Sequence, residues 1–245
     1  MRLALIGYGK MGKEIERLAL ERGWTVGVRV DLDTPKPDAT AMSAVDAAIH
    51  FAQARGIIAD LTPWAELGKP IVVGTTGWSK DLQNVQNMVR AKGNGLVHAP
   101  NFSVGVNIFY QLVRTAATMF DRFEEYDAFI HEVHHKDKVD SPSGTALTLA
   151  EIVLKEIKRK KELLAHAPDG KIRTDQLHVS STRGGAVVGI HSLTFDSAAD
   201  SIELRHVAKN RTGFALGAML AAEWVQGKKG MFTMEDVLQD LFGQK

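Results

Sequence analysis

The chain has 245 residues, enough for one large domain or two smaller ones, and its 44% hydrophobic and 24% charged residues are typical of a soluble protein. Its formal net charge of +1, and the absence of any apolar run near the roughly 20 residues that span a bilayer, argue against nucleic-acid and membrane partners. The absence of cysteine excludes disulfides, thiolate catalysis and cysteine-ligated zinc, and fits a cytoplasmic protein.

Short apolar runs alternate with helical patterns in the N-terminal part of the chain. Residues 11–22 carry apolar residues at helical spacing between charged ones, and Gly23 ends the pattern. The expected strands are 3–6, 25–30, 56–60, 70–74 and 96–99, and a second helix is expected at 81–92. This alternation is typical of a doubly wound parallel sheet with helices on both faces.

The pattern changes after Asn101. The expected elements are helices at 104–120 and 142–161, a strand at 127–133, β-like runs at 177–182, 186–195 and 201–207, and closing helices at 214–225 and 235–242. Turns separate the three β-like runs, as in an antiparallel meander. The sequence therefore predicts an α/β protein with a Rossmann-type doubly wound parallel sheet, formed by residues 1–101 and 213–245, and an inserted α+β domain at 102–212.

A glycine-rich turn joins the first predicted strand to the first predicted helix. Its sequence, Gly7-Tyr8-Gly9-Lys10-Met11-Gly12, has the pattern G-x-G-x-x-G. The first glycine permits a tight turn, the second lets a pyrophosphate approach the backbone, and the third lets the helix pack on the strand. The helix N-terminus then receives the phosphates. The turn predicts a dinucleotide site, although the same glycines would also suit a plain strand-to-helix connection.

Asp31 ends the second predicted strand, where a carboxylate binds the adenosine ribose hydroxyls in such folds. The alternative is a solvated acid at a strand end. An acid here repels a 2′-phosphate, and Leu32 offers no guanidinium for one. Arg29 should point to the opposite face from Val30 and is a poor substitute, although Lys36 could reach the phosphate. We therefore predict that NADH is preferred and that NADPH is used more weakly.

Two further turns follow predicted strands of the same sheet. Gly74-Thr75-Thr76-Gly77 consists of small residues that would let a nicotinamide lie close to the backbone. Ala99-Pro100-Asn101-Phe102 follows the next strand and could supply amide hydrogen bonds or close the nicotinamide pocket. Because the carboxyl ends of parallel strands meet at one edge of a sheet, both turns are candidate cofactor contacts. A plain turn remains the alternative for the first of them.

The run from Glu132 to Lys138 gathers proton donors and positive charge. His134 and His135 can exchange protons near neutral pH, and in an extended segment they point to opposite sides. A metal site is not expected, because adjacent histidines chelate poorly and the nearby lysines oppose a cation. Glu132 could orient a histidine or pair with a lysine. A plain polar loop is the remaining alternative.

The run Ser-Pro-Ser-Gly-Thr at 141–145 predicts the start of a helix, with a serine cap and proline in the first turn. The N–H groups near Gly144 and Thr145 would then receive a carboxylate. This helix start and the preceding polar run bring a proton donor, cations and backbone N–H groups into one small volume. Such a volume suits a small anionic substrate.

Five strings together resemble the 4-hydroxy-tetrahydrodipicolinate reductase family, formerly called the dihydrodipicolinate reductase family. They lie at 7–12, 74–77, 101–107, 132–138 and 141–146. The resemblance implies that His134 is the general acid and Lys138 the second catalytic residue. It further implies that His135, Gly144 and Thr145 bind the substrate carboxylates. The implied cofactor contacts are Gly7, Tyr8, Gly9, Lys10, Met11, Gly12, Asp31, Gly74, Thr75, Thr76, Ala99, Pro100, Asn101 and Phe102.

The reaction implied by this resemblance is NAD(P)H-dependent reduction of 4-hydroxy-tetrahydrodipicolinate to tetrahydrodipicolinate in diaminopimelate and lysine biosynthesis. Hydride would come from C4 of the nicotinamide and a proton from His134. Members of the family are usually homotetramers joined through the sheet of the substrate domain, which makes 177–207 a candidate for that surface. The alternatives are another dehydrogenase, acting on an amino acid or its imine, and a cofactor-sensing protein without turnover.

Overall fold

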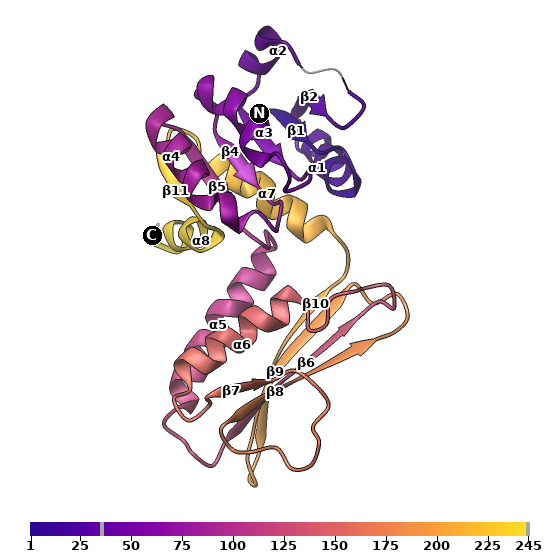
Figure 1. Ribbon diagram of the computed structural model, residues 1–245, viewed down its shortest axis with the longest axis vertical. Helices are drawn as coiled ribbons and strands as arrows, with labels where there is room; N and C mark the ends of the chain where they lie inside the picture. The colour runs from indigo at the N-terminus through magenta and orange to yellow at the C-terminus, as the bar shows by residue number, and fades with distance from the viewer. Residues whose placement is uncertain (35–36, 244–245) are drawn as a thin grey trace. The chain divides into compact units, whose positions relative to one another are not determined.

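The computed structural model describes residues 1–34 and 37–243, so Lys36, considered above for a 2′-phosphate, lies outside the described residues. The chain forms two compact units (Figure 1), unit 1 of Met1–Val104 with Arg211–Lys245 and unit 2 of Gly105–Asn210. The domain boundaries predicted from the sequence fall at residues 101 and 213. None of the helices in the described ranges has both the length and the apolar character that a membrane crossing requires.

Unit 1 is built on a parallel sheet of six strands in the order β11-β5-β4-β3-β1-β2. The strands are β1 (Arg2–Ile6), β2 (Thr25–Val30), β3 (Ala47–His50), β4 (Ile71–Val73), β5 (Gly95–His98) and β11 (Gly230–Phe232). The helices are α1 (Lys10–Glu21), α2 (Ala39–Ser43), α3 (Ile57–Glu66), α4 (Leu82–Lys92), α7 (Thr212–Trp224) and α8 (Met234–Gly243), with a 3-10 turn at Ser79–Asp81. This is the predicted Rossmann-like architecture.

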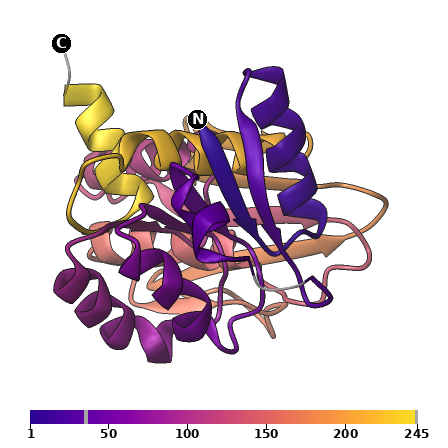
Figure 2. The same cartoon turned by 90° about the horizontal axis from the view of Figure 1, so that it is seen from above.

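Helices cover both faces of this sheet because alternate side chains of each strand are buried on opposite sides. One face packs on α2, α3 and α4, through a core that includes Ile6, Val28 and Val73. The other face packs on α1 and α7, which contact β2, β3 and β4 and each other. Figure 2 shows α1 alongside β1 and β2. Strands buried on both sides explain the short continuous apolar runs of the sequence.

The sequence prediction of a strand at 56–60 is wrong. These residues form the start of α3, and the missed strand is β3. Ile57, Leu61 and Ala65 recur at helical spacing and are buried. A short apolar run does not by itself distinguish a strand from a buried helix. The three-residue strand β11 was also missed, because it is too short to give a periodic signal.

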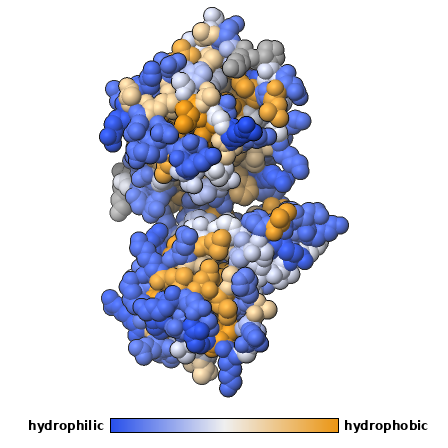
Figure 3. Space-filling view, viewed as in Figure 1, coloured by the Kyte–Doolittle hydropathy of each residue, from blue (hydrophilic) through white to orange (hydrophobic). Residues whose placement is uncertain are grey.

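Unit 2 packs two helices on one face of a five-stranded mixed sheet, in the order β10-β9-β6-β8-β7. The strands are β6 (Asp127–His134), β7 (Glu162–Leu164), β8 (Gln176–Arg183), β9 (Gly189–Asp196) and β10 (Ser201–Ala208), and the helices are α5 (Val104–Phe120) and α6 (Gly144–Glu156). The shared core includes Phe109, Val113, Ile130 and Leu193. Apolar side chains also reach the surface of this unit (Figure 3). Leu112 of α5 is one of the exposed apolar residues.

The predicted meander is only partly correct. β9 and β10 form an antiparallel pair, but β8 does not pair with β9. Instead β6 lies between them, parallel to β8 and antiparallel to β9. The connection from β6 to β8 runs through α6, and a helical crossover is what a parallel pair requires. The order of the strands therefore follows from this crossover rather than from the turns between successive runs.

The helix predicted at 142–161 is shorter than expected, since α6 ends at Glu156. The chain then turns, and Lys160 is 2% exposed, with its ammonium 2.6 Å from the carbonyl oxygen of Gln176 and 2.5 Å from a carboxylate oxygen of Asp127. The charged run at 158–161 is therefore not entirely solvated. Its third residue joins the end of α6 to the sheet.

Gly217 of α7 provides a test of the packing in unit 1. A Cβ atom there would lie 1.7 Å from the carbonyl oxygen of Phe102, whereas one at Gly213 of the same helix would lie 3.4 Å from the Ser103 hydroxyl oxygen. We expect Gly217→Ala to destabilise the protein by about 1–3 kcal/mol through overpacking, despite the helix propensity of alanine. Gly213→Ala is the matched control and should have a Tm equal to the wild type or higher. Equal Tm values for both variants would contradict this packing.

Candidate active site

Three loops that carry predicted cofactor residues, and the loop after β3, start at one edge of the sheet of unit 1. The N–H group of the first residue of each loop donates to a carbonyl of the neighbouring strand, which continues the hydrogen-bond pattern of the sheet. Gly7 donates to the carbonyl of Val30 at 2.8 Å, and Phe51 donates to that of Ile6 at 2.7 Å. Gly74 donates to the carbonyl of His50 at 2.9 Å, and Ala99 to that of Val73 at 3.2 Å. The structure thus brings the predicted cofactor residues together along the carboxyl edge of the sheet, the edge that binds ligands in open α/β sheets.

The glycine turn fits a dinucleotide. Gly7 has φ +90° and a Cβ atom there would lie 2.5 Å from the carbonyl oxygen of Phe51. A Cβ at Gly12 would lie 2.5 Å from the carbonyl oxygen of Gly7. In contrast, a Cβ at Gly9 would meet no atom of the chain within 4 Å. The protein's own packing therefore does not require glycine at position 9, and the open space before α1 suits a pyrophosphate.

The end of β2 places Asp31 at the surface next to this turn. Asp31 accepts the N–H of Leu32 through its carboxylate at 2.9 Å, and Leu32 is 84% exposed. Arg29 lies on the face of β2 away from the core around Val28, as the sequence predicts. Its guanidinium reaches back over the ring of Tyr8, with Cζ 5.7 Å from the ring centroid.

Sequence reasoning missed His50, the last residue of β3. It is buried, and its Nδ1 lies 2.7 Å from the hydroxyl of Thr75, which donates to the carbonyl of Ala52 at 3.0 Å. The other ring nitrogen of His50, Nε2, lies 3.3 Å from a carboxylate oxygen of Asp60. Burial lowers the pKa of His50, although Asp60 opposes the shift. Thr75 is therefore held by the chain itself, while Thr76 and Pro100 are exposed.

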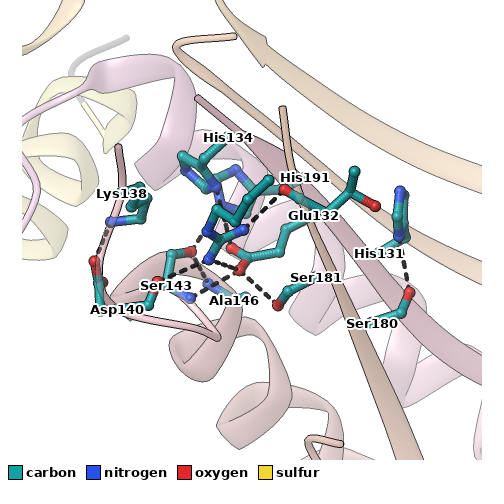
Figure 4. Close-up of polar contacts among 12 residues, drawn as sticks. His131, Glu132, His134, Lys138, Asp140, Ser143, Ala146, Ser180, Ser181 and His191 are labelled. Atoms are coloured by element: carbon teal, nitrogen blue, oxygen red, sulfur yellow. Dashed lines mark hydrogen bonds and ion pairs between the residues drawn. The ribbon is translucent and has the colours of Figure 1, made fainter. Parts of the chain in front are cut away.

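In unit 2, the β6 residues Glu132 and His134 point to the inner face of the sheet, toward the start of α6 (Figure 4). Glu132 is fully buried, and one carboxylate oxygen accepts three hydrogen bonds. The donors are the Ser143 N–H at 3.0 Å, the Ser181 hydroxyl at 2.7 Å and the Arg183 guanidinium at 2.7 Å. Glu132 therefore ties the start of α6 to β6 and β8.

The cap of α6 differs from the prediction. Ser143, not Ser141, is the N-cap, and its hydroxyl accepts the N–H of Ala146 at 3.2 Å. Pro142 precedes the cap instead of occupying the first turn. Gly144 and Thr145 are nevertheless the first residues of the helix, at the end where the helix dipole favours an anion. Their role in binding a carboxylate stays a prediction.

The second oxygen of Glu132 faces two histidines. It lies 3.4 Å from Nδ1 of His134 and 3.5 Å from Nε2 of His191, which is paired with Glu132 across the sheet. Burial raises the pKa of Glu132, but the hydrogen bonds that reach the carboxylate outweigh burial and hold the pKa well below its usual range. Glu132 is therefore a carboxylate at all physiological pH values, and both roles considered for it, orienting a histidine and pairing with a cation, apply. The cation is Arg183 rather than a lysine.

His134 is neutral in this environment. Burial lowers its pKa to about 4, and the charge of Glu132 only partly opposes this. The charges of His191, Lys138 and Arg183 lower the pKa further. A neutral imidazole at pH 7 can accept a proton, but it can donate one as a strong acid only after its pKa has risen.

Lys138 follows His134 in a loop that holds it near the histidine. Its ammonium lies 2.7 Å from a carboxylate oxygen of Asp140, and its N–H donates to the carbonyl of His135 at 3.2 Å. His135 is partly buried and Gly144 is exposed. The structure therefore brings His134, Lys138 and the start of α6 together on one surface of unit 2, where cations and a helix N-terminus favour an anion (Figure 4).

Arg183 and His191 were missed as members of this site. Ligand atoms of Glu132, His134 and His191 lie within 4.8 Å of one another, close enough to hold a metal ion. The guanidinium of Arg183 already neutralises the Glu132 carboxylate and opposes a cation there. The cluster is better suited to orienting the imidazole of His134 and to stabilising its protonated form.

Comparison with known proteins gives consistent matches over both units. Residues 1–102 match the family described as dihydrodipicolinate reductase, N-terminus, and residues 105–238 match dihydrodipicolinate reductase, C-terminus. A 4-hydroxy-tetrahydrodipicolinate reductase of Christiangramia forsetii is 38% identical over 99% of this chain and 99% of its own. One of Archaeoglobus fulgidus is 36% identical over 98% of this chain and 100% of its own.

A solved structure, a dipicolinate-bound dihydrodipicolinate reductase from Paenisporosarcina sp. TG-14, superposes with a TM-score of 0.77. It is 21% identical and covers 95% of this chain and 97% of its own, so it supports the fold. An amine dehydrogenase from Mycobacterium smegmatis shares the fold more loosely, with a TM-score of 0.62 at 11% identity, over 96% of this chain and 95% of its own. With both family regions matched and relatives at this level of identity, the chain belongs to the dihydrodipicolinate reductase family.

Proposed function

We propose that the chain reduces 4-hydroxy-tetrahydrodipicolinate to tetrahydrodipicolinate in diaminopimelate and lysine biosynthesis, with a reduced nicotinamide dinucleotide as cofactor. The observation that carries this proposal is the juxtaposition of His134 with the capped start of α6, both held by the buried Glu132. It supplies a proton donor next to a carboxylate-binding helix end. Family membership makes this reaction the first candidate. An amino-acid dehydrogenase or a cofactor sensor would not need this combination.

In the proposed reaction, each substrate-binding residue has a role set by its chemistry. Gly144 and Thr145 present the helix N-terminus to one carboxylate, and His135 binds a carboxylate. Lys138, which has to exchange Asp140 for substrate, stabilises charge that develops in the ring. The 4-hydroxyl group of the substrate leaves as water, and when bound, the cofactor supplies hydride from C4 of its nicotinamide. His134 then gives a proton to the reduced ring and is left neutral, the state that its burial favours.

The cofactor contacts that we propose lie along the carboxyl edge of unit 1. Gly7, Tyr8, Gly9, Lys10, Met11 and Gly12 would hold the pyrophosphate, and Asp31 the ribose hydroxyls. Gly74, Thr75, Thr76, Ala99, Pro100, Asn101 and Phe102 would surround the nicotinamide end. The exposed acid Asp31, followed by the exposed Leu32, supports a preference for NADH, with NADPH used more weakly.

We also propose that the chain forms a homo-oligomer, a homotetramer by analogy with its family, through the sheet of unit 2. In the described part of the unit, both helices pack on the inner face of this sheet, so that no helix covers the outer face. Phe129 of the central strand β6 alternates with the buried Ala128 and Ile130, points outward and is 39% exposed. A partly apolar sheet face without a covering helix is suited to pack on a second copy.

The reaction is tested by following NADH oxidation with substrate generated from pyruvate and aspartate semialdehyde by the preceding synthase. NADH should be consumed only when the synthase is present, and NADPH should give a lower kcat/KM. His134→Gln should lower kcat on the order of 10²-fold through loss of the general acid. His166→Gln, in an exposed loop of the same unit, is the control and should keep full activity. Unchanged kcat in His134→Gln would remove this residue from the proton-donor role.

Binding of a dicarboxylate should change the charge of His134. In the free protein its pKa is about 4, so it is neutral at pH 7, and two nearby carboxylates raise that pKa. Pyridine-2,6-dicarboxylate should therefore bind with net proton uptake at pH 6–7, and affinity should rise as the pH falls toward about 4. Calorimetry in buffers of different ionisation enthalpy measures the uptake. His134→Gln should lower it and His166→Gln should not; equal uptake in both would contradict the assignment.

The oligomer is tested by light scattering after size exclusion. The wild type should have four times the chain mass of 26.8 kDa. Phe129→Glu places a charge on the outer face of the sheet and should produce smaller species with an unchanged fold, because this side chain is not part of the core. Phe123→Glu, at a phenylalanine that is 51% exposed outside the sheet, is the matched control. A Phe129→Glu protein that keeps the wild-type mass would argue against this surface.

A further inference from the structure

A closed cluster of three side chains lies beside the glycine turn of unit 1. The carboxylate of Glu16, on α1, accepts hydrogen bonds from the Tyr8 hydroxyl and from two nitrogens of the Arg29 guanidinium. One of these, from Arg29 Nε, measures 3.2 Å. The Glu16 side chain is only 12% exposed, so the ion pair is partly shielded from water. The carboxylate of Glu16 therefore binds the Tyr8 hydroxyl and the Nε and Nη2 atoms of Arg29 at the same time.

The cluster stands next to the position of the adenosine ribose in the proposed cofactor site. Tyr8 belongs to the glycine turn itself, and Arg29 of β2 is two residues before Asp31, the first residue after the strand. In extended backbone, residues two apart point to the same side. Arg29 is the only arginine on β2, and its side chain is directed along that side toward α1 rather than toward Asp31.

The chemistry of the two coenzymes differs at this position. NADPH carries a 2′-phosphate with two ionisable oxygens, and a guanidinium is the side chain that binds phosphate best, through paired charge-assisted hydrogen bonds. Arg29 is engaged in such a pair already, with Glu16. To bind a phosphate with the same Nε–Nη2 edge, Arg29 would have to leave that carboxylate, and Glu16 would then be left as a second negative charge close to the phosphate.

We propose that Glu16 is a specificity-determining residue of the coenzyme site, which holds Arg29 away from a 2′-phosphate and thereby favours NADH. The inference rests on the coenzyme site of the proposed function and extends it from Asp31 to a residue of α1. The preference for NADH would then have two causes: repulsion of the 2′-phosphate by Asp31, and the Glu16–Arg29 ion pair, called the lock below.

The test uses Glu16→Gln, which keeps the shape of the side chain and removes the charge that holds Arg29. The affinities of the full-length protein for NADP+ and NAD+ are measured by calorimetry, and kcat/KM for NADPH and NADH in the coupled assay. Release of Arg29 should improve the affinity ratio in favour of NADP+ by about tenfold, the value of one charge-assisted hydrogen bond. Binding of NAD+ should change little, which also reports that the variant is folded.

Three comparisons separate the effect of the Glu16–Arg29 ion pair from a general charge effect. Glu21→Gln removes the same charge from the far end of α1, where Glu21 is 59% exposed and pairs with Arg17, and should leave the ratio unchanged. Arg29→Met alone should not weaken NADP+ binding, since Arg29 is already occupied. In Glu16→Gln with Arg29→Met, the gain for NADP+ should disappear.

The outcomes distinguish this inference from the proposed function. A Glu16→Gln protein with the wild-type ratio, a gain that survives Arg29→Met, or a loss of NADP+ binding in Arg29→Met alone would each overturn the role of Glu16. A wild type that binds both coenzymes equally would contradict the NADH preference. In that case, a gain in Glu16→Gln that depends on Arg29 would still support the lock. Failure to bind either coenzyme would contradict both.

Discussion

The buried carboxylate of Glu132 is the constraint on which the arrangement of unit 2 depends. A buried charge without partners costs several kcal/mol, so its partners must be in place when the unit folds. They come from three elements distant in the sequence: Ser143 before α6, Ser181 and Arg183 on β8, and His191 on β9. The same contacts fix the start of α6 beside the ring of His134. The carboxylate of Glu132 therefore both joins the elements of unit 2 and sets the geometry around His134.

Unit 1 depends on a different constraint, the close approach of loops at the carboxyl edge of a parallel sheet. Gly7 and Gly74 both leave room for Phe51, whose backbone and ring occupy the space that their Cβ atoms would fill. These glycines are explained by packing within the chain, whereas Gly9 is not. Of the three positions, Gly9 is thus the one where packing within the chain does not require glycine, and it is the one expected to face a ligand. The fingerprint contains structural and ligand-directed glycines side by side.

The sequence predicted best the elements that depend on interactions between residues close together in the chain. β1, α1 and β2, and the glycine turn, follow from runs of adjacent residues and were predicted nearly to the residue. The order of strands in unit 2 depends on the path of α6, which no local pattern reports. Arg183 and His191 were missed for a related reason, although a signal existed. On β9, His191 continues the buried face that includes Leu193, and on β8, Arg183 continues the face that includes Val179 and Ser181. A polar residue that continues a largely apolar face predicts a buried partner: His191 pairs with Glu132 across the sheet, and Arg183 forms an ion pair with the same carboxylate.

The low pKa of His134 has a consequence for the choice of substrate. An imidazole with a pKa of about 4 carries no proton to donate at neutral pH, so the acid has to be created when the substrate binds. Only a ligand with enough negative charge near the ring can raise that pKa, because Lys138 and Arg183 act in the opposite direction. In the proposed reaction, the two carboxylates of the substrate supply this charge. A neutral molecule of the same shape would bind beside a histidine that stays unprotonated. The site would thus distinguish dicarboxylates in the protonation step as well as in binding.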